Sequence, residues 1–233
     1  MIKAIFFDTG PIISLVMSRL GWILPRLKEQ YGGKFYITPA VKRELVERPL
    51  EIKRFEFEAL QVMKFIREGV LEVYTDVPLS KVKKLKLLAN SAFKIQNKTM
   101  DVIQEGELES VTSALDIGAE AVVMDERTLR LLIEDGVKMQ KLLEARFHRE
   151  VAVDLAKIKE FSQVFNKLKI IRSIELVGVA YELGLLDSYV PDIKNGRNVL
   201  VDSVLWATKY NGCAVTEPEI EELKSYLKNY ARN

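Results

Sequence analysis

Short apolar runs alternate with longer helical patterns, and this alternation constrains the fold more than any other feature of the chain. The runs are "KAIFF" (3–7), "KFYI" (34–37), "LEVY" (71–74) and "EAVVM" (120–124), all rich in the residues of buried strands. Strands that alternate with helices form a mostly parallel sheet covered on both faces. We therefore expect an α/β protein with a three-layer α/β/α domain and a mostly parallel central sheet.

Capping residues mark the helices between these runs. Thr38-Pro39 reads as an N-cap followed by a proline at the first helical position. Apolar residues at helical spacing predict helices over 51–69, over 79–96, which is rich in lysine, and over 107–117. The glycines expected to end helices are Gly69, Gly118 and Gly136. These elements complete the expected α/β/α unit by about residue 137.

The remainder of the chain has helical periodicity. Residues 139–169 show apolar residues at helical spacing and no obvious strand, and Thr216 with Glu219 forms a capping box ahead of the last helix. We expect this part to be a helical extension packed on the core. Leu142, Leu143 and Phe147 suggest in addition that residues 139–167 help to form a homodimer.

Composition excludes several classes of protein. The net charge is +2, from 35 basic and 33 acidic residues, so any affinity for nucleic acid must come from a local patch. A single cysteine and a single histidine exclude a disulfide framework and a Cys/His zinc cage, so a bound metal would need oxygen ligands. Apolar runs fall short of the roughly 20 residues that a membrane span needs, and the start lacks a signal-peptide pattern. We expect a cytoplasmic protein without a membrane segment.

Four acids fall at informative places. Asp8 and Asp125 each end a predicted strand, Glu44 lies in the second turn of the helix that starts after Thr38, and Glu107 begins the helix before the fourth strand. Ligands of open parallel sheets bind at the carboxyl ends of the strands. Crowded carboxylates need a neutralising cation, and Mg²⁺ or Mn²⁺ prefers oxygen ligands. The pattern predicts a carboxylate metal site suited to phosphodiester cleavage, although each acid alone also reads as a cap or a solvated helix residue.

Neighbouring residues could support such a site. Thr9 could orient a metal-bound water or cap the following helix, and Arg127 or Arg130 could hold a phosphate or pair with an acid. Glu105 and Glu109 are close enough to Glu107 to replace or assist it.

Three stretches also resemble a known family. "IFFDTGPII", "YITPAVKREL" and "GELESVTSALDIGAEAVVMDERTLR" are similar to the PIN domain, whose members include VapC-type toxins and other metal-dependent ribonucleases. The third stretch is the most specific, because it is similar to the Gly-Glu-x-Glu-Ala and Asp-Asp-Arg segments of a mostly prokaryotic PIN-like group, with Asp125-Glu126-Arg127 here in place of the latter. The resemblance covers residues 1–137 well and continues weakly into the C-terminal helices.

The resemblance implies a fold, a site and an activity. It implies a PIN-like domain over 1–137, a helical insertion over 138–170 and C-terminal helices packed on the core over 171–233. It implies that Asp8, Glu44, Glu107 and Asp125 are both catalytic and metal-binding, with Mg²⁺ or Mn²⁺, RNA as the substrate, and an antitoxin or another protein as a partner. The family often has Asp where this chain has Glu107. The alternative is a catalytically degenerate scaffold that binds RNA or protein.

Overall fold

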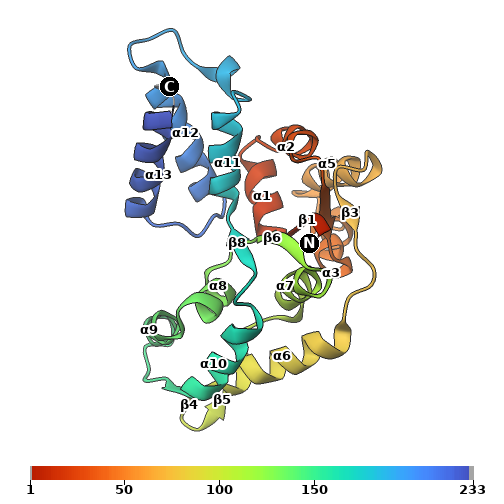
Figure 1. Cartoon of the computed structure of the whole chain (residues 1–233), viewed down its shortest axis with the longest axis vertical. Coiled ribbons are helices and arrows are strands. Elements are labelled where there is room, and N and C mark those ends of the chain that lie inside the picture. Colours follow the sequence, from red (N-terminus) through yellow and green to blue (C-terminus); the bar gives the residue numbers. More distant parts are fainter. Residues whose placement is uncertain (1, 231–233) are drawn as a thin grey trace.

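The computed structural model describes residues 2–230, and its centre is a parallel sheet of five strands (Figure 1). The strands, in spatial order, are β3 (Glu72–Val73), β2 (Lys34–Ile37), β1 (Ile2–Phe7), β6 (Ala119–Val123) and β8 (Lys169–Ile171). Each neighbouring pair is parallel. β1, β2, β3 and β6 lie where the four apolar runs predict strands, so the α/β class and the parallel sheet are confirmed.

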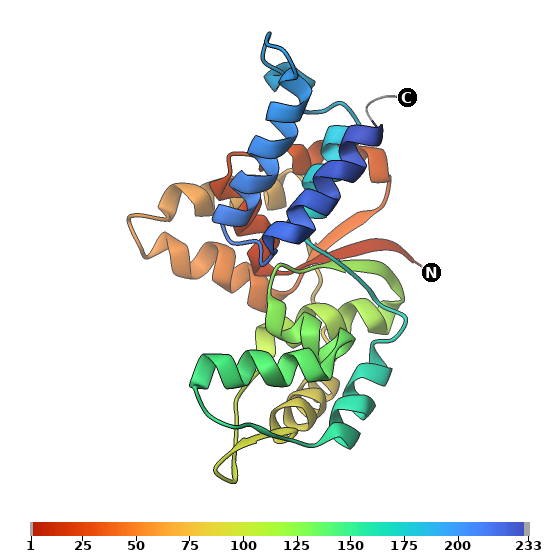
Figure 2. The same ribbon diagram turned by 90° about the vertical axis from the view of Figure 1, so that its left-hand side faces the viewer.

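Helices cover both faces of this sheet, with the C-terminal helices on one side and the middle of the chain on the other (Figures 1 and 2). One face carries α1 (Thr9–Met17), α2 (Ile23–Tyr31), α5 (Glu56–Arg67), α11 (Ser173–Glu182), α12 (Gly196–Tyr210) and α13 (Glu217–Tyr230). The other carries α6 (Leu79–Ser91), α7 (Glu105–Ile117), α8 (Arg127–Glu134), α9 (Gly136–Phe147) and α10 (Leu155–Val164). Along β1, Phe7 packs in the first layer, whereas Ala4 and Phe6 pack in the second, because successive side chains of a strand point to opposite faces.

The fifth strand was not expected from the sequence. Residues 139–169 were predicted to lack a strand and the sheet to be complete by residue 137, but β8 begins at Lys169 and pairs with β6, with Ile171 opposite Val123. A run of three residues carries too little periodicity to be recognised, and it becomes a strand because β6 offers a free edge. The segment 138–170 therefore includes the short strand β7 (Ala152–Val153) and the start of a strand of the central sheet, as well as α10 and most of α9.

The helix predicted over 79–96 is shorter than expected. It ends at Ser91, and the chain continues as β4 (Phe93–Ile95) and β5 (Lys98–Thr99). Gln96 and Asn97 both have positive φ, as a two-residue hairpin turn requires. A strand from the segment between α9 and α10, β7 (Ala152–Val153), pairs with β4 on its other side and completes a small antiparallel sheet.

The three glycines expected to end helices differ in backbone conformation and in their place relative to the helices. Gly69 and Gly118 adopt the left-handed conformation just after α5 and α7, as predicted. The helix before Gly136 also ends as predicted, because α8 stops at Glu134 with Asp135 as its C-cap, but Gly136 itself begins α9, whose N-cap is the same Asp135. A Cβ on Gly136 would lie 2.5 Å from Ile158 Cγ2 of α10. The absence of a side chain at this position therefore serves the close packing of two helices.

Two of the residues that suggested a homodimer face the protein's own core. Leu143 of α9 is buried, and Leu142 packs partly buried against the same cluster. Phe147 is 44% exposed. The apolar spacing of α9 is thus largely explained by packing within the chain, and the homodimer stays a prediction.

The connection after β2 carries one of the expected acids. Thr38 accepts a hydrogen bond from the Val41 amide and caps α3 (Pro39–Lys42), as predicted. The helix then widens into a π-helical turn, η1 (Arg43–Glu47), and ends as α4 (Arg48–Leu50). Such turns are rare and occur often at functional sites.

Two further observations complete the fold. A short 3₁₀ turn, η2 (Asp187–Tyr189), lies in the expected loop before α12, and the capping box of Thr216 and Glu219 is present at the start of α13. Among residues 2–230, every helix is too short or too polar to cross a membrane.

Candidate metal centre

A cavity of about 270 Å³ lies at the carboxyl edge of the central sheet, where β1 and β6 end. It is lined by Asp8, Thr9, Gly10, Glu44, Gln104, Glu107, Asp125, Glu126 and Gly212. The four acids expected from the sequence thus meet at one place. A fifth carboxylate, that of Glu126, joins them.

Asp8 is the most deeply placed of the acids that carry a shifted pKa. It is 6% exposed, and its amide donates to the Val123 carbonyl at 2.9 Å, which fixes it at the end of β1 beside β6. Burial raises the pKa of Asp8 to about 7. The Thr9 amide opposes this rise, and the charges of Glu44, Glu126 and Asp125 add to it.

Glu107 approaches the cavity from the first turn of α7. Its carboxylate accepts a hydrogen bond from the Gln104 amide at 3.2 Å and so completes a capping box. Burial, followed by the charge of Glu126, raises the pKa of Glu107 to about 8. The Gln104 amide acts in the opposite direction, so desolvation and like charge outweigh the cap.

Glu44 reaches the cavity from the π-helical turn η1. The hydroxyl of Thr9 donates to Glu44 Oε2 at 2.7 Å. A Cβ on Gly106 would lie 3.3 Å from Glu44 Oε1, so the glycine leaves room for this carboxylate against the start of α7. Thr9 was expected to orient a water or cap the following helix, and in the structure it orients Glu44.

Asp125 lies at the cavity, but its oxygens are occupied within the protein. The amide and hydroxyl of Ser173 and the hydroxyl of Ser14 all donate to it at 2.7 Å. A carboxylate has about four acceptor positions, so three internal donors leave little capacity for a ligand. Asp125 therefore anchors the end of β6 to α1 and α11, a role that the sequence did not predict.

Glu126 was missed as a site residue. Its Oε2 accepts from the Leu129 amide at 2.8 Å and caps α8, while the carboxylate also lines the acidic cavity. It is the charge with the largest effect on the pKa of Glu107. The sequence did hold a signal, because Glu126 is the second acid of the Asp125-Glu126-Arg127 segment.

Other residues singled out from the sequence lie outside the cavity. Glu109 is buried and accepts from the Ala40 amide at 3.3 Å, so it does not replace or assist Glu107. Glu105, the first residue of α7, is also outside the lining set. Arg127 and Arg130 line a neighbouring cavity.

The donor set of the acidic cavity fits a hard divalent cation. Within residues 2–230, no group of three or more His, Cys, Asp or Glu side chains stands close enough to form a ready-made metal cage. Mg²⁺, however, is usually bound through one or two carboxylates together with waters and substrate phosphates. The raised pKa values of Asp8 and Glu107 reflect burial and crowded negative charge, and a cation would offset that charge.

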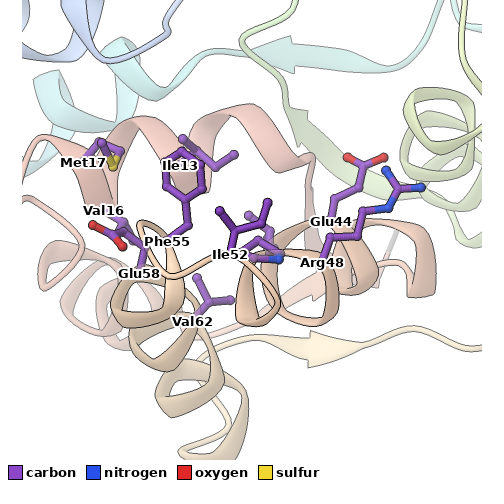
Figure 3. Close-up of a pocket in the computed structure, with 11 residues that line it drawn as sticks. Ile13, Val16, Met17, Glu44, Arg48, Ile52, Phe55, Glu58 and Val62 are labelled. Carbon is purple, nitrogen blue, oxygen red and sulfur yellow. The ribbon is translucent and has the colours of Figure 1, made fainter.

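An apolar cavity of about 360 Å³ adjoins this site between α1, η1, α4 and α5 (Figure 3). Its lining consists of Ile13, Val16, Met17, Glu44, Leu45, Arg48, Pro49, Ile52, Phe55, Glu58 and Val62. Glu44 lines both cavities, and Figure 3 shows it beside Arg48 at one end of the apolar side chains. An occupant of the apolar cavity would therefore contact an acid of the candidate metal centre.

No protein-family model, curated protein or solved structure matches the chain. The functional argument accordingly depends on the residues and their geometry.

Proposed function

We propose that the protein is a Mg²⁺- or Mn²⁺-dependent endoribonuclease of the PIN-like group. The observation that carries this proposal is the convergence of five carboxylates on one cavity at the carboxyl edge of a parallel sheet. The α/β/α layering and the resemblance of the segments around Asp8, Glu44 and Asp125 support the PIN-like assignment.

The residues divide into ligands and positioning groups. Asp8, Glu44, Glu107 and Glu126 are the acids whose carboxylates remain for a cation, whereas Asp125 holds the edge of the site together. A bound divalent cation would supply an activated water and stabilise the leaving oxygen. Thr9 keeps Glu44 directed at the cavity through its hydroxyl.

Proton transfer is suited to the same acids. The attacking water forms a bond to phosphorus and loses a proton, while the bond from phosphorus to the leaving oxygen breaks. Asp8 and Glu107 line the cavity in which that water would react, so their carboxylates are placed to receive its proton.

Incubation with mixed-sequence RNA and DNA tests the proposal directly. We expect cleavage of RNA with Mg²⁺ or Mn²⁺, loss of cleavage with a chelator, and loss of cleavage in Asp8→Asn. Wild-type ribonuclease activity of Asp8→Asn at saturating Mn²⁺ would show that the proposed site is wrong.

The apolar cavity supports a second candidate function, that of a non-catalytic PIN-like scaffold with a protein partner. Ile13 and Ile52, which line this cavity, are 43% and 48% exposed, as suits apolar side chains that a partner covers. An antitoxin is the partner that the family resemblance suggests. The scaffold predicts no metal-dependent cleavage of either nucleic acid, so the same incubation separates the two functions.

A further inference from the structure

A second polar cavity, of about 480 Å³, adjoins the acidic one. It is lined by Arg127, Arg130, Leu131, Glu134, Lys138, Ala214, Val215, Thr216 and Glu219. The same two segments of chain line both cavities. Glu126 and Gly212 line the acidic cavity, and Arg127 and Ala214, which follow them closely in sequence, line this one. The Ala214 amide donates to the Asp125 carbonyl at 3.3 Å and joins these segments at the boundary.

Arg127 and Arg130 bring positive charge that the fold does not use. Neither guanidinium forms an ion pair within residues 2–230, and over the same residues Arg130 Nε is buried without a hydrogen-bond partner. A buried donor without a partner costs free energy. Arg127 is also the first residue of α8, where a cation interacts unfavourably with the helix dipole. Neither arginine is therefore placed to stabilise its own helix.

The acids and the lysine of this cavity are partly engaged elsewhere. Glu219 accepts from Arg172 Nη1 at 2.8 Å and from the Thr216 hydroxyl at 2.6 Å. Lys138 lies 3.2 Å from Asp135. Glu134 is exposed and belongs to the last turn of α8. The two free guanidinium groups are thus the donors that remain for an anion, and their planar geometry suits phosphate oxygens.

We propose that this cavity holds the backbone phosphate next to the scissile one, so that the enzyme recognises a single-stranded RNA chain by at least two consecutive linkages. The inference rests on the proposed ribonuclease function and deepens it. A strand whose scissile phosphate lies at the carboxylates can pass along the shared wall formed by residues 126–130 and 212–216. Its neighbouring phosphate then meets Arg127 and Arg130.

Charge removal from the substrate and from the protein tests this directly. In the neutral strand, one phosphate linkage next to the scissile bond, on one side or the other, is replaced by an uncharged methylphosphonate. The native strand keeps its phosphate there, and both strands carry a 2′-O-methyl group on the nucleotide at the replaced linkage. We expect one flanking position to lower wild-type kcat/KM roughly tenfold or more, because a phosphate contact is lost. Arg127→Gln/Arg130→Gln is expected to lose a similar factor on the native strand and nothing further on the neutral one.

The control is Arg67→Gln, in the last turn of α5 near the opposite edge of the sheet, which is expected to cleave both strands like the wild type. The inference is overturned if the double variant cleaves the native strand at the wild-type rate. It is equally overturned if the losses from the variant and from the neutral linkage multiply, because independent losses mean separate contacts.

A binding measurement separates failure of this inference from failure of the proposed function. In an Asp8→Asn background with chelator, where no cleavage is expected, the dependence of log Kd on log salt is measured for an RNA strand. Removing both arginines is expected to reduce this slope by about 0.7, because both contact the one phosphate held in this cavity and each neutralised phosphate of a single strand contributes about 0.7. An unchanged slope overturns the inference. If no RNA is cleaved by the wild type, the proposed function fails, and the slope still decides whether the arginines bind the strand.

Discussion

Burial and like charge together raise the pKa of Asp8, so ionisation of the site destabilises the folded protein. The folded pKa of about 7 lies above the ordinary value of 3.8, and that of Glu107 is about 8 against 4.5. A raised carboxyl pKa means that the contribution of the group to stability is complete below its unfolded pKa and is lost as pH rises through the folded pKa. Charging these acids therefore destabilises the metal-free protein between about pH 4 and pH 8.

Glu219 acts in the opposite direction. Burial alone would raise its pKa, but the hydroxyl and amide of Thr216 and the guanidinium of Arg172 lower it to about 2. Its contribution is present above its unfolded pKa and is lost as pH falls from there towards 2. Together these groups favour greatest stability of the metal-free protein near pH 4, where Glu219 is mostly ionised and Asp8 and Glu107 are still mostly protonated in the fold.

The first prediction concerns Asp8→Asn. In chelator, the free energy of unfolding of the wild type is expected to fall between pH 5 and pH 8.5, and the variant is expected to be more stable at pH 8.5 by about 2–4 kcal/mol, because it removes a buried charge. Thermal unfolding at both pH values measures this. Asp192→Asn, in an exposed loop, serves as the control. A variant that is less stable than the wild type at pH 8.5 would contradict the prediction.

The second prediction separates Asp125 from Glu126. Asp125→Asn is expected to cost about 1.5–3 kcal/mol of stability, because Asp125 accepts from two serine hydroxyls and an amide. Glu126→Gln keeps an oxygen for the Leu129 amide and is expected to change stability by about 1 kcal/mol or less.

Mn²⁺ titration followed by calorimetry completes this comparison. Glu126→Gln is expected to weaken Mn²⁺ binding about tenfold or more, because substitution of a residue around a metal ion typically lowers metal affinity by that factor. Unchanged Mn²⁺ affinity of Glu126→Gln would contradict its role as a metal ligand. Unchanged stability of Asp125→Asn would contradict its role as a structural anchor.

At the scale of elements, capping residues and apolar spacing predicted much of the structure. Thr38 caps its helix and Gly118 ends its helix as expected. Gly136 shows the limit of this reasoning, because α8 does end just before it, but the residue itself begins α9 and packs closely against α10. A glycine after an apolar pattern does not reveal whether backbone conformation or a close neighbour requires it.

The third prediction follows from that contact. Gly136→Ala places a Cβ about 2.5 Å from Ile158 Cγ2, and it is expected to cost about 1–3 kcal/mol, the usual effect of overpacking. Ile158→Ala removes the obstructing atoms, so Gly136→Ala is expected to cost markedly less in that background. Chemical denaturation of the four proteins of this cycle measures the coupling. Equal costs in both backgrounds would show that the contact does not cause the loss.

At the scale of the molecule, the central sheet depends on chain segments far apart in sequence. β8 comes from residues 169–171, beyond the first 137 residues. The C-terminal helices contribute Ile174, Val177 and Leu205 to the same apolar cluster as Phe7 and Val123. The unit predicted over residues 1–137 therefore lacks one strand and part of the cover of one face.

The fourth prediction is that residues 1–137 alone do not fold cooperatively. Without β8 and α11–α13, the edge of β6 and one apolar face of the sheet are left open. We expect no cooperative thermal transition by circular dichroism at a temperature where the full chain remains folded. A cooperative transition of the truncated chain would show that the later segments are dispensable for the core.

The sequence by itself determined the α/β class, four strands and the acids at the carboxyl edge, because each depends on local spacing and on where a strand stops. It predicted Asp8, Glu44 and Glu107 at the cavity that they do line. Only the tertiary structure decided that β8 completes the sheet, that Glu109 lies outside the cavity, that Ser14 and Ser173 occupy the oxygens of Asp125, and that Glu126 takes a place at the cavity. These outcomes depend on contacts between residues distant in sequence, and such contacts leave no periodic pattern in the chain.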